Sequence, residues 1–328
     1  MSKILIIDPG KGWGHFVSKM YCYQKLAESL NSKIIFLTKK STQAKHYLKL
    51  SSFCEEVIYL DEPQKGLKNI FQNIKSFFNN ISIINKLNFE RCFVFHPSLR
   101  YLLIAKFSKA KNIWGLGLRF QNFFLKKNKK LYLSFFSKTI QDDYEALEFV
   151  KKIASLKHIN FKPLYSTKVD FRDTVGVIIA ASGNEKRWSI KNYVKVINYL
   201  IDKNYKKFLI ISGIDQLKEE LLIKEKFSDK IEMIFSSNKN ISDVIPYLKK
   251  CKFCVGNDTG FSHLSINLNI ETVIIHGDCP PQSYSDLISH IDIDEDVTRS
   301  ATSINTITVE KALTKLSNFL HGRDGRVV

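Results

Sequence analysis

The chain of 328 residues contains the segment Val255-Gly256-Asn257-Asp258-Thr259-Gly260-Phe261-Ser262-His263-Leu264. Its apolar start is typical of the end of a buried strand, Asp-Thr-Gly is typical of a tight turn, and the residues after the turn favour a helix. Free amide groups at the start of such a helix, together with the helix dipole, form a site for an anion. The structural alternative is that Asp258 or Thr259 simply caps the helix and that His263 is an ordinary helix histidine.

Strands and helices alternate on both sides of this segment. Apolar runs predict strands at Val175–Ala181, Lys207–Ser212, Ile231–Phe235, Phe253–Val255 and Thr272–His276. Amphipathic periodicity predicts helices at Ile190–Asp202, Asp215–Phe227, Ile241–Lys250 and Phe261–Leu268. This order is typical of a parallel sheet with crossover helices.

A second, less regular alternation occupies the first half of the chain. It begins with a predicted strand at Lys3–Asp8, a glycine-bearing turn at Pro9–Gly14 and a helical stretch. Further strands are predicted at Lys33–Thr38, Glu56–Leu60, Arg91–His96 and Asn112–Gly115. Since the pattern breaks around His158–Asp173, we expect two doubly wound, Rossmann-like α/β domains, residues 1–165 and 166–328, facing an interdomain ligand cleft. The sequence leaves open whether the last helix packs back on the first domain.

The composition is that of a soluble globular chain, with 44% hydrophobic and 25% charged residues. Apolar runs such as Val175–Ala181 are far shorter than the ~20 residues that span a bilayer. The first apolar run ends at Asp8, so we expect a strand there rather than a signal peptide. Six cysteines without regular spacing are expected to be reduced thiols of a cytoplasmic protein. The net charge of +18 indicates an anionic partner: nucleic acid, lipid headgroups or a phosphorylated substrate.

A second polar loop follows the predicted strand at Val175–Ala181. It reads Ser182-Gly183-Asn184-Glu185-Lys186-Arg187-Trp188-Ser189. A hydroxyl, a glycine and two cations at the carboxyl end of a strand suit a ligand that bears phosphate. We expect Ser182 to donate a hydrogen bond to a diphosphate, Lys186 to pair with it and Trp188 to pack behind the loop. The alternative is a solvated loop in which Trp188 is only a core anchor.

Together these segments resemble glycosyltransferase family nine, the ADP-heptose:lipopolysaccharide heptosyltransferases. Residues 256–264, followed by Ile274–Pro280, look like the family's D-T-G-x-x-H-L block and the strand-Gly-x-x-x-Pro turn behind it. Residues 182–188 look like its loop of small and hydroxyl residues followed by Lys-x-Trp. Val94–Arg100 with Ala110–Gly117 resembles a weaker pattern of the acceptor domain.

The resemblance implies a GT-B fold with a nucleotide-sugar in the C-terminal domain and an acceptor in the N-terminal domain. The candidate nucleotide-sugar-binding residues are Ser182, Lys186, Trp188, Gly213, Asp258, Thr259, Gly260 and His263. The candidate acceptor-binding residues are Gly12, Trp13, Gly14 and Arg100. Lys186 and His15 are the candidate catalytic residues.

The N-terminal loop departs from the family. Members usually carry Gly-Asp after the first strand, and that Asp is taken as the catalytic base, whereas this chain reads Gly10-Lys11-Gly12-Trp13-Gly14-His15-Phe16. His15 stands where the Asp is expected, and an imidazole, which ordinarily titrates near pH ~6.5, can remove the proton of an acceptor hydroxyl. The alternatives are that His15 only caps the helix and that Asp8, or no residue, acts as the base.

Three other motifs carry no function in this interpretation. The spacing of Gly10-x-Gly12-x-Gly14 is not that of a dinucleotide fingerprint, so a nicotinamide enzyme is not expected. Cys251-x-x-Cys254 lacks a second ligand pair, and we expect core thiols rather than a zinc site. Asp292-x-Asp294 is interpreted as part of an acidic loop. We expect no metal and no cofactor, because cations and helix amides can stabilise a leaving diphosphate.

A basic run at Phe123–Leu133 places lysines between aromatic and aliphatic residues. One interpretation is attachment to the inner face of the cytoplasmic membrane, where a lipid-linked acceptor would lie. The alternative is a solvated loop. Other lysines of the first half favour an anionic acceptor or membrane surface, namely Lys39, Lys40, Lys45, Lys106, Lys109 and Lys111.

The resemblance therefore implies an inverting, metal-independent glycosyltransferase. It would move a sugar, heptose favoured, from a nucleoside-diphosphate sugar such as ADP-heptose to an anionic lipid-linked or oligosaccharide acceptor, such as the lipopolysaccharide core or another cell-envelope saccharide. Two alternatives remain: a sugar-nucleotide epimerase or hydrolase of the same fold, and a basic nucleic-acid-binding protein. The sequence contains no motif for nucleic-acid recognition.

Overall fold

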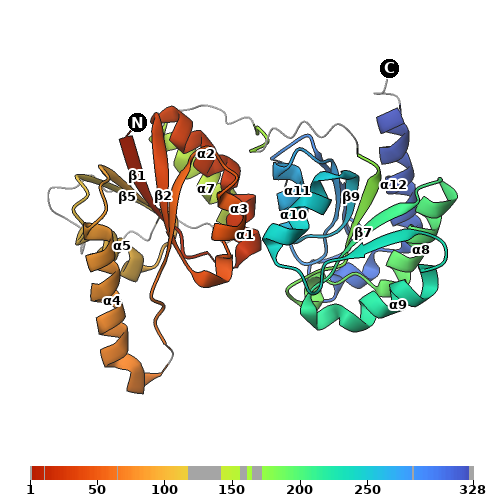
Figure 1. Ribbon diagram of the computed structural model, residues 1–328, viewed down its shortest axis with the longest axis horizontal. Helices are drawn as coiled ribbons and strands as arrows, with labels where there is room; N and C mark the ends of the chain where they lie inside the picture. The colour runs from red at the N-terminus through yellow and green to blue at the C-terminus, as the bar shows by residue number, and fades with distance from the viewer. Residues whose placement is uncertain are drawn as a thin grey trace. The chain divides into compact units, whose positions relative to one another are not determined.

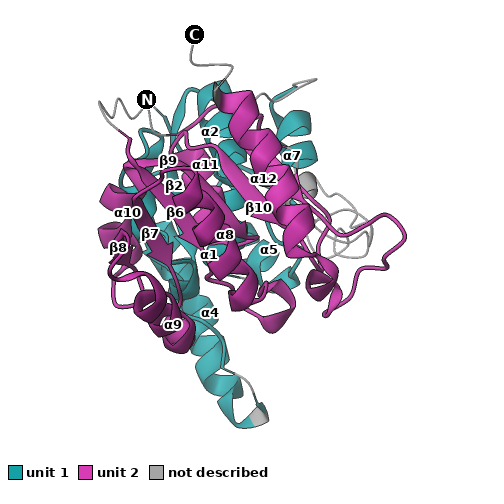
Figure 2. Cartoon of the chain, turned by 90° about the vertical axis from the view of Figure 1, so that its right-hand side faces the viewer, with its two compact units in different colours: residues 1–159 teal, residues 160–328 magenta. Residues whose placement is uncertain are grey.

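The computed structural model describes residues 2–10, 12–64, 66–116, 142–155, 161–164, 172–282 and 284–324. The chain divides into two compact units, unit 1 at residues 1–159 and unit 2 at residues 160–328 (Figure 2). Each unit is built on a parallel sheet with helices on both faces (Figure 1). The predicted pair of doubly wound α/β sheets is confirmed. The basic run at 123–133 and Gly117 lie outside the described residues.

In the described part of unit 1, five strands form a sheet in the order β3-β2-β1-β4-β5. The strands are β1 (Ser2–Ile7), β2 (Ser32–Thr38), β3 (Cys54–Tyr59), β4 (Arg91–Val94) and β5 (Asn112–Gly115). One face carries α1 (Trp13–Ser18), α2 (Met20–Ser29), α3 (Lys45–Leu48) and α7 (Asp142–Ile153), and the other carries α4 (Ile70–Asn85) and α5 (Leu99–Lys106) (Figure 1). Short 3₁₀ helices lie at Lys40–Thr42 and Leu67–Asn69. The helical stretch predicted after the first turn is thus two helices, which meet at Lys19.

In the described part of unit 2, six strands form a sheet in the order β11-β10-β9-β6-β7-β8. The strands are β6 (Thr174–Ile178), β7 (Lys207–Ile211), β8 (Glu232–Phe235), β9 (Cys251–Asn257), β10 (Thr272–Ile275) and β11 (Ile288–Ile291). One face carries α8 (Ile190–Asp202), α9 (Leu217–Phe227) and α12 (Val309–Asp324), and the other carries α10 (Ile241–Lys249) and α11 (Gly260–Asn267) (Figure 1). Short 3₁₀ helices lie at Asn184–Lys186, Ile214–Gln216 and Ser303–Thr306. The strands and helices predicted for this half are present, with ends that differ by a few residues.

The core of unit 2 lies between the sheet and the helices α8 and α12. All five residues of β6 are buried, as expected of a central strand that is covered on both faces. On α12, Ala312, Leu316 and Leu320 recur every four residues and are buried in the same apolar cluster as the strands. The last helix therefore packs its apolar side against α8 and β11 within unit 2.

The two cysteines with zinc-like spacing are buried in unit 2, outside this apolar cluster. Cys251 and Cys254 are both buried on β9. A hydrogen bond with Cys254 and burial raise the pKa of Cys251 well above its usual value, so this thiol stays protonated. Among the described residues, no group of three or more potential ligands is placed to hold a metal ion.

Gly256 allows β9 and β6 to approach each other closely. Gly256 pairs with Ile178 in the parallel register, and a Cβ atom built on Gly256 would lie 2.2 Å from the carbonyl oxygen of Ile178. Because that oxygen belongs to the backbone of a buried strand, it has no room to move. The glycine before Asn-Asp-Thr-Gly is therefore required by packing between strands.

We predict that Gly256→Ala lowers the free energy of unfolding by about 1–3 kcal/mol, because the new methyl group forces two central strands apart. Gly322→Ala is the matched control, since a Cβ atom there meets nothing within 4 Å. This change in α12 should stabilise the protein by up to about 1 kcal/mol. Urea denaturation of both variants measures the difference, and equal stability of the two would contradict the packing argument.

Candidate active site

The loop after β1 is fixed by a buried ion pair. Asp8 is fully buried, and its carboxylate accepts hydrogen bonds from Lys19 Nζ at 2.5 Å, from the hydroxyl of Tyr23 and from the amide of Gly10 at 2.9 Å. Burial, the charge of Asp8 and the hydrogen bond to it raise the pKa of Tyr23 well above its usual value. With its oxygens held in this way, Asp8 is a structural anchor and a poor alternative to His15 as a base.

His15 lies on α1, and its side chain is exposed. Gly12 occupies the N-cap position of this helix, so His15 is not its N-terminal cap. Trp13 and Gly14 are half-buried on the same short helix, and the Trp13 ring lies 6.4 Å from that of Tyr47. The candidate acceptor residues of this loop are therefore adjacent to the candidate base.

Arg100 lies apart from this loop, on α5. Its guanidinium donates to Ser76 Oγ at 2.8 Å and lies over the ring of Phe77, both on α4. Partial burial lowers the pKa of Arg100. In this structure Arg100 holds α4 against α5, and its predicted contact with an acceptor stays a prediction.

In unit 2, Lys186 and Asp258 come together although 72 positions separate them in the sequence. Lys186 Nζ lies 3.5 Å from Asp258 Oδ2. Burial opposes the charge on Lys186, but the carboxylate of Asp258, helped by Cys279 and Asp278, outweighs burial and raises the lysine pKa. The loop after β6 therefore presents a stable cation beside the Asp-Thr-Gly turn after β9.

Asp258 is an ionised carboxylate surrounded by nitrogen groups. His263 Nε2 lies 3.1 Å from its Oδ1, and His276 Nδ1 lies 3.9 Å from its Oδ2. Burial alone would raise the pKa of Asp258, but the hydrogen bond and charge of His263, then His276 and Lys186, hold it well below its usual range. The other ring nitrogen of His263 lies 2.8 Å from the hydroxyl of Tyr284, which fixes the ring orientation.

Thr259 is the N-cap residue of α11, but its hydroxyl does not cap the helix. The Oγ1 atom is buried and has no hydrogen-bond partner among the described residues. Gly260, the first residue of the helix, is buried beside it. A hydroxyl without a partner at a helix N-terminus, near Lys186, is suited to an anionic oxygen. The Thr259 side chain therefore does not act as a simple N-cap, which was the structural alternative for this residue.

The remaining candidate nucleotide-sugar-binding residues differ in their burial and in their hydrogen bonds. Ser182 is exposed at the start of the loop. Trp188 is buried, and its indole nitrogen donates to the carbonyl of Ile307 at 2.8 Å, so it anchors the loop in the core. Its predicted contact with a nucleotide-sugar stays a prediction. The amide of Gly213 donates to Gln216 Oε1 at 3.2 Å, and Gln216 Nε2 donates to the carbonyl of Ile179 at 2.8 Å.

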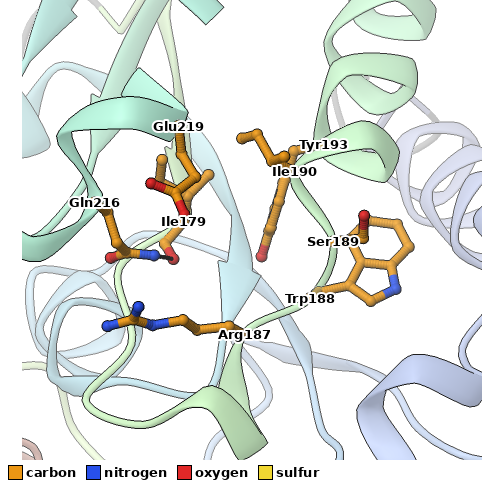
Figure 3. Close-up of a pocket in the computed structure, with 8 residues that line it drawn as sticks. All are labelled: Ile179, Arg187, Trp188, Ser189, Ile190, Tyr193, Gln216 and Glu219. Atoms are coloured by element: carbon orange, nitrogen blue, oxygen red, sulfur yellow. Dashed lines mark hydrogen bonds between the residues drawn. The ribbon is translucent and has the colours of Figure 1, made fainter. Parts of the chain in front are cut away.

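A small cavity of about 170 Å³ lies beside Trp188 at the carboxyl ends of β6 and β7 (Figure 3). It is lined by Ile179, Arg187, Trp188, Ser189, Ile190, Tyr193, Gln216 and Glu219. In Figure 3, the guanidinium of Arg187 and the amide of Gln216 lie on one side and the rings of Tyr193 and Trp188 on the other. Arg187 also forms an ion pair with Asp215. The cavity combines polar groups with aromatic rings next to the loop that carries Lys186.

The sequence interpretation missed His276, His290, Tyr284 and Asn257 as parts of this region. His276 is fully buried directly after β10, and its Nε2 lies 3.0 Å from Nδ1 of His290. Burial lowers the pKa of His276 to about 4, with Asp258 opposing this shift and His290 adding to it. No spacing in the sequence marked these residues: the pairing of β10 with β9 places Ile275 opposite Asn257, which brings the next residues, His276 and Asp258, to the same edge.

We predict that the buried His276 makes stability fall as the pH drops from 6.5 towards 4. The His276 side chain takes up a proton near pH 6.5 in the unfolded state and only near pH 4 in the folded state. Its effect on the free energy of unfolding is therefore absent as a penalty above pH 6.5 and grows as the pH falls. About 3 kcal/mol is lost across this window. His276→Phe should flatten the pH dependence of urea unfolding, whereas His321→Gln, at an exposed position of α12, should leave it unchanged. A slope that His276→Phe does not alter would show that this imidazole titrates normally.

Comparisons with known proteins place the chain in a family and a fold. Residues 89–302 match the sequence model of glycosyltransferase family 9 (heptosyltransferase). No curated protein sequence matches the chain.

The chain is similar to the solved structure of E. coli heptosyltransferase WaaC with ADP, with a TM-score of 0.73 and 12% identity over 96% of this chain and 99% of the other. It is similar to a family 9 glycosyltransferase of Veillonella parvula, with a TM-score of 0.73 and 16% identity over 98% and 97% of the two chains. For E. coli ADP-heptose lps heptosyltransferase II the TM-score is 0.72, with 16% identity over 98% and 99%.

These likenesses show that the two sheets form the GT-B fold. Since the family model covers more than half of the chain, and includes the loop with Lys186 and the turn with Asp258, the chain belongs to glycosyltransferase family 9.

Proposed function

We propose that the protein transfers a sugar, with ADP-heptose as the favoured donor, to a saccharide of the cell envelope such as the lipopolysaccharide core, with inversion and without a metal ion. The observation that carries this proposal is the unpartnered Thr259 hydroxyl at the start of α11, beside Lys186 and Asp258. A glycosyltransferase of this family needs a site for the diphosphate of its donor. The names of the similar structures include ADP and an ADP-heptose analogue, which supports the choice of donor.

The diphosphate would be held by three kinds of donor. Lys186 supplies a permanent positive charge, Thr259 supplies a hydroxyl, and the first turn of α11 supplies backbone amides and the positive end of its dipole. Asp258 holds the Lys186 ammonium and the His263 ring in place. As the bond to the anomeric carbon breaks, negative charge grows on the leaving phosphate, and these donors stabilise it more strongly than in the bound substrate.

The acceptor would be activated in unit 1. His15 takes the proton of the acceptor hydroxyl, and the hydroxyl oxygen attacks the anomeric carbon as the carbon–phosphate oxygen bond breaks. A single in-line displacement inverts the configuration at that carbon. Ser182 and Gly213 are proposed to contact the nucleotide-sugar, and Gly12, Trp13 and Gly14 to shape the acceptor site beside His15.

We predict that Lys186→Ala lowers turnover at least ~100-fold and weakens ADP binding, because each lost donor to a developing charge costs ~3 kcal/mol. Lys191→Ala is the matched control, an exposed lysine on the neighbouring helix α8 that should leave both quantities unchanged. Release of nucleoside diphosphate and calorimetric ADP binding measure the effects. Near-normal turnover of Lys186→Ala would remove its phosphate role, and rapid turnover of ADP-heptose without an acceptor would favour an epimerase or hydrolase.

We predict that His15→Ala loses most of kcat, at least ~100-fold, while ADP binding is retained. In the wild-type protein, kcat should rise with pH between about 6 and 7, where an imidazole loses its proton.

His15→Asp restores the residue that the family uses, and it should recover part of the rate and move the rise to lower pH. Rates measured from pH 5 to 8 test this. Full activity of His15→Ala would place the base elsewhere, and loss of ADP binding in that variant would contradict the assignment of donor and acceptor to different units.

A further inference from the structure

Helix α4 of unit 1 leaves one apolar side uncovered. Phe71 is 85% exposed and Phe78 is 62% exposed, values that are high for such large apolar side chains. We define the α4 face as the exposed side chains Ile70, Phe71, Ile74 and Phe78 together with Phe107 at the end of α5. The four helix positions recur at the spacing of one side of an α-helix. Contiguous exposed apolar surface of this kind is typical of an interaction site.

The α4 face is held in position by the C-terminal half of the helix. Asn80, Ile81 and Ile84 are buried against the sheet. Phe77 lies edge-on to the rings of Phe78 and Phe107, at centroid distances of 5.5 and 6.4 Å. The exposed rings of Phe78 and Phe107 are therefore held by contact with Phe77.

The surroundings of the α4 face are predominantly basic, although the carboxylate of Asp61 accepts a hydrogen bond from Asn79 on this helix. Between Pro63 and Gln141 the sequence has a single acidic residue, Glu90, against fifteen lysines and arginines. Exposed lysines lie along the helix and beside its ends: Lys68, Lys75, Lys86 and Lys109. Within the described part of the chain, these four form no ion pair with a carboxylate. The positive charge is thus available for an anionic partner.

We propose that the α4 face docks on an anionic lipid bilayer. Its aromatic and aliphatic side chains would enter the headgroup region while the lysines contact lipid phosphates. None of the described helices has both the length and the apolar character needed to cross a bilayer, so the contact is peripheral. If the proposed function holds, this contact brings the enzyme to a lipid-linked acceptor.

The position of α4 in the fold fits this role. In a parallel sheet the carboxyl ends of the strands share one edge, so α4, which follows β3, starts at the edge where the loop after β1 leads to His15. Figures 1 and 2 show the first turns of α4 projecting from the rest of unit 1. A bilayer at the α4 face would therefore lie at the same end of the unit 1 sheet as the candidate base.

The positive charge around the α4 face favours a bilayer, rather than a second copy of the chain, as its partner. Two α4 faces packed together would bring their lysines close to one another, with no carboxylate from α4 to offset the repulsion. An anionic bilayer supplies the opposite charge along the whole face.

The first experiment measures sedimentation of the full chain with vesicles. We expect binding to phosphatidylethanolamine vesicles that contain phosphatidylglycerol, and little binding to phosphatidylcholine. Phe71→Ser/Phe78→Ser should lower the partition coefficient at least ~10-fold. Leu221→Ser/Leu222→Ser is the matched control: these leucines of α9 are 55% and 41% exposed, and their loss should change nothing. Equal binding of the two double variants would overturn the proposal.

A second pair of variants tests the charge. Lys75→Glu should weaken binding by at least about fivefold, and the effect should shrink as salt is added. Lys224→Glu on α9 makes the same change in net charge away from the face and should have little effect. If both variants lose binding equally, the attraction comes from net charge alone and the α4 face is not the docking site.

Two further readouts separate this proposal from its alternatives. A wild-type dimer that Phe71→Ser/Phe78→Ser converts to a monomer in analytical ultracentrifugation, with no vesicle binding, would show a second copy as the occupant and overturn the proposal. Calorimetric ADP binding of the same double variant should equal that of the wild type. If the wild type binds vesicles but not ADP, the proposed function fails and the docking surface stands.

Discussion

The arrangement of the candidate site in unit 2 depends on one buried side-chain amide. Asn257, the last residue of β9, is fully buried, and its Nδ2 donates to the carbonyl of Ile179 at 2.7 Å. Its Oδ1 accepts from the backbone amide of Trp188 at 3.1 Å and from the hydroxyl of Tyr193 at 2.8 Å. These bonds tie the loop after β6 to the turn after β9, so the position of Lys186 relative to Asp258 follows from them. Each bond is short and shielded from water, and loss of the amide would leave several buried groups without a partner.

Much of the fold was predictable because strands and helices leave a strong periodic signal. In unit 2 the buried strands are short apolar runs, and α8 repeats its buried positions, such as Tyr193, Ile197 and Leu200, at helical spacing. Unit 1 was less regular, and the break between α1 and α2 at Lys19 leaves no mark in the hydrophobic pattern. The packing of α12 was likewise open, since an apolar stripe indicates that a helix is buried but not which sheet it contacts.

The candidate site was predictable only where its residues lie next to one another in the sequence. The turn at Asp258–Gly260 with His263 is contiguous, and so is the loop with Lys186, which explains why both were found. His276 and Asn257 were missed, because their roles arise from contacts between strands. The register of a sheet brings such residues together, and no spacing along the chain reveals it. His263 illustrates the same point: the sequence motif predicts this residue, but it does not predict the Tyr284 hydroxyl that fixes the orientation of its ring.

The buried ion pair of Asp8 and Lys19 restricts how this chain can diverge. Removal of one partner alone would leave an uncompensated charge in the interior, at a cost of about 3–5 kcal/mol, which is a large part of the stability of a domain. Replacement of both by apolar residues of similar size is often tolerated. The two positions are therefore expected to change together among relatives, even though they are eleven residues apart, one directly after β1 and the other between α1 and α2. An alignment of close relatives would record this pair as correlated substitutions.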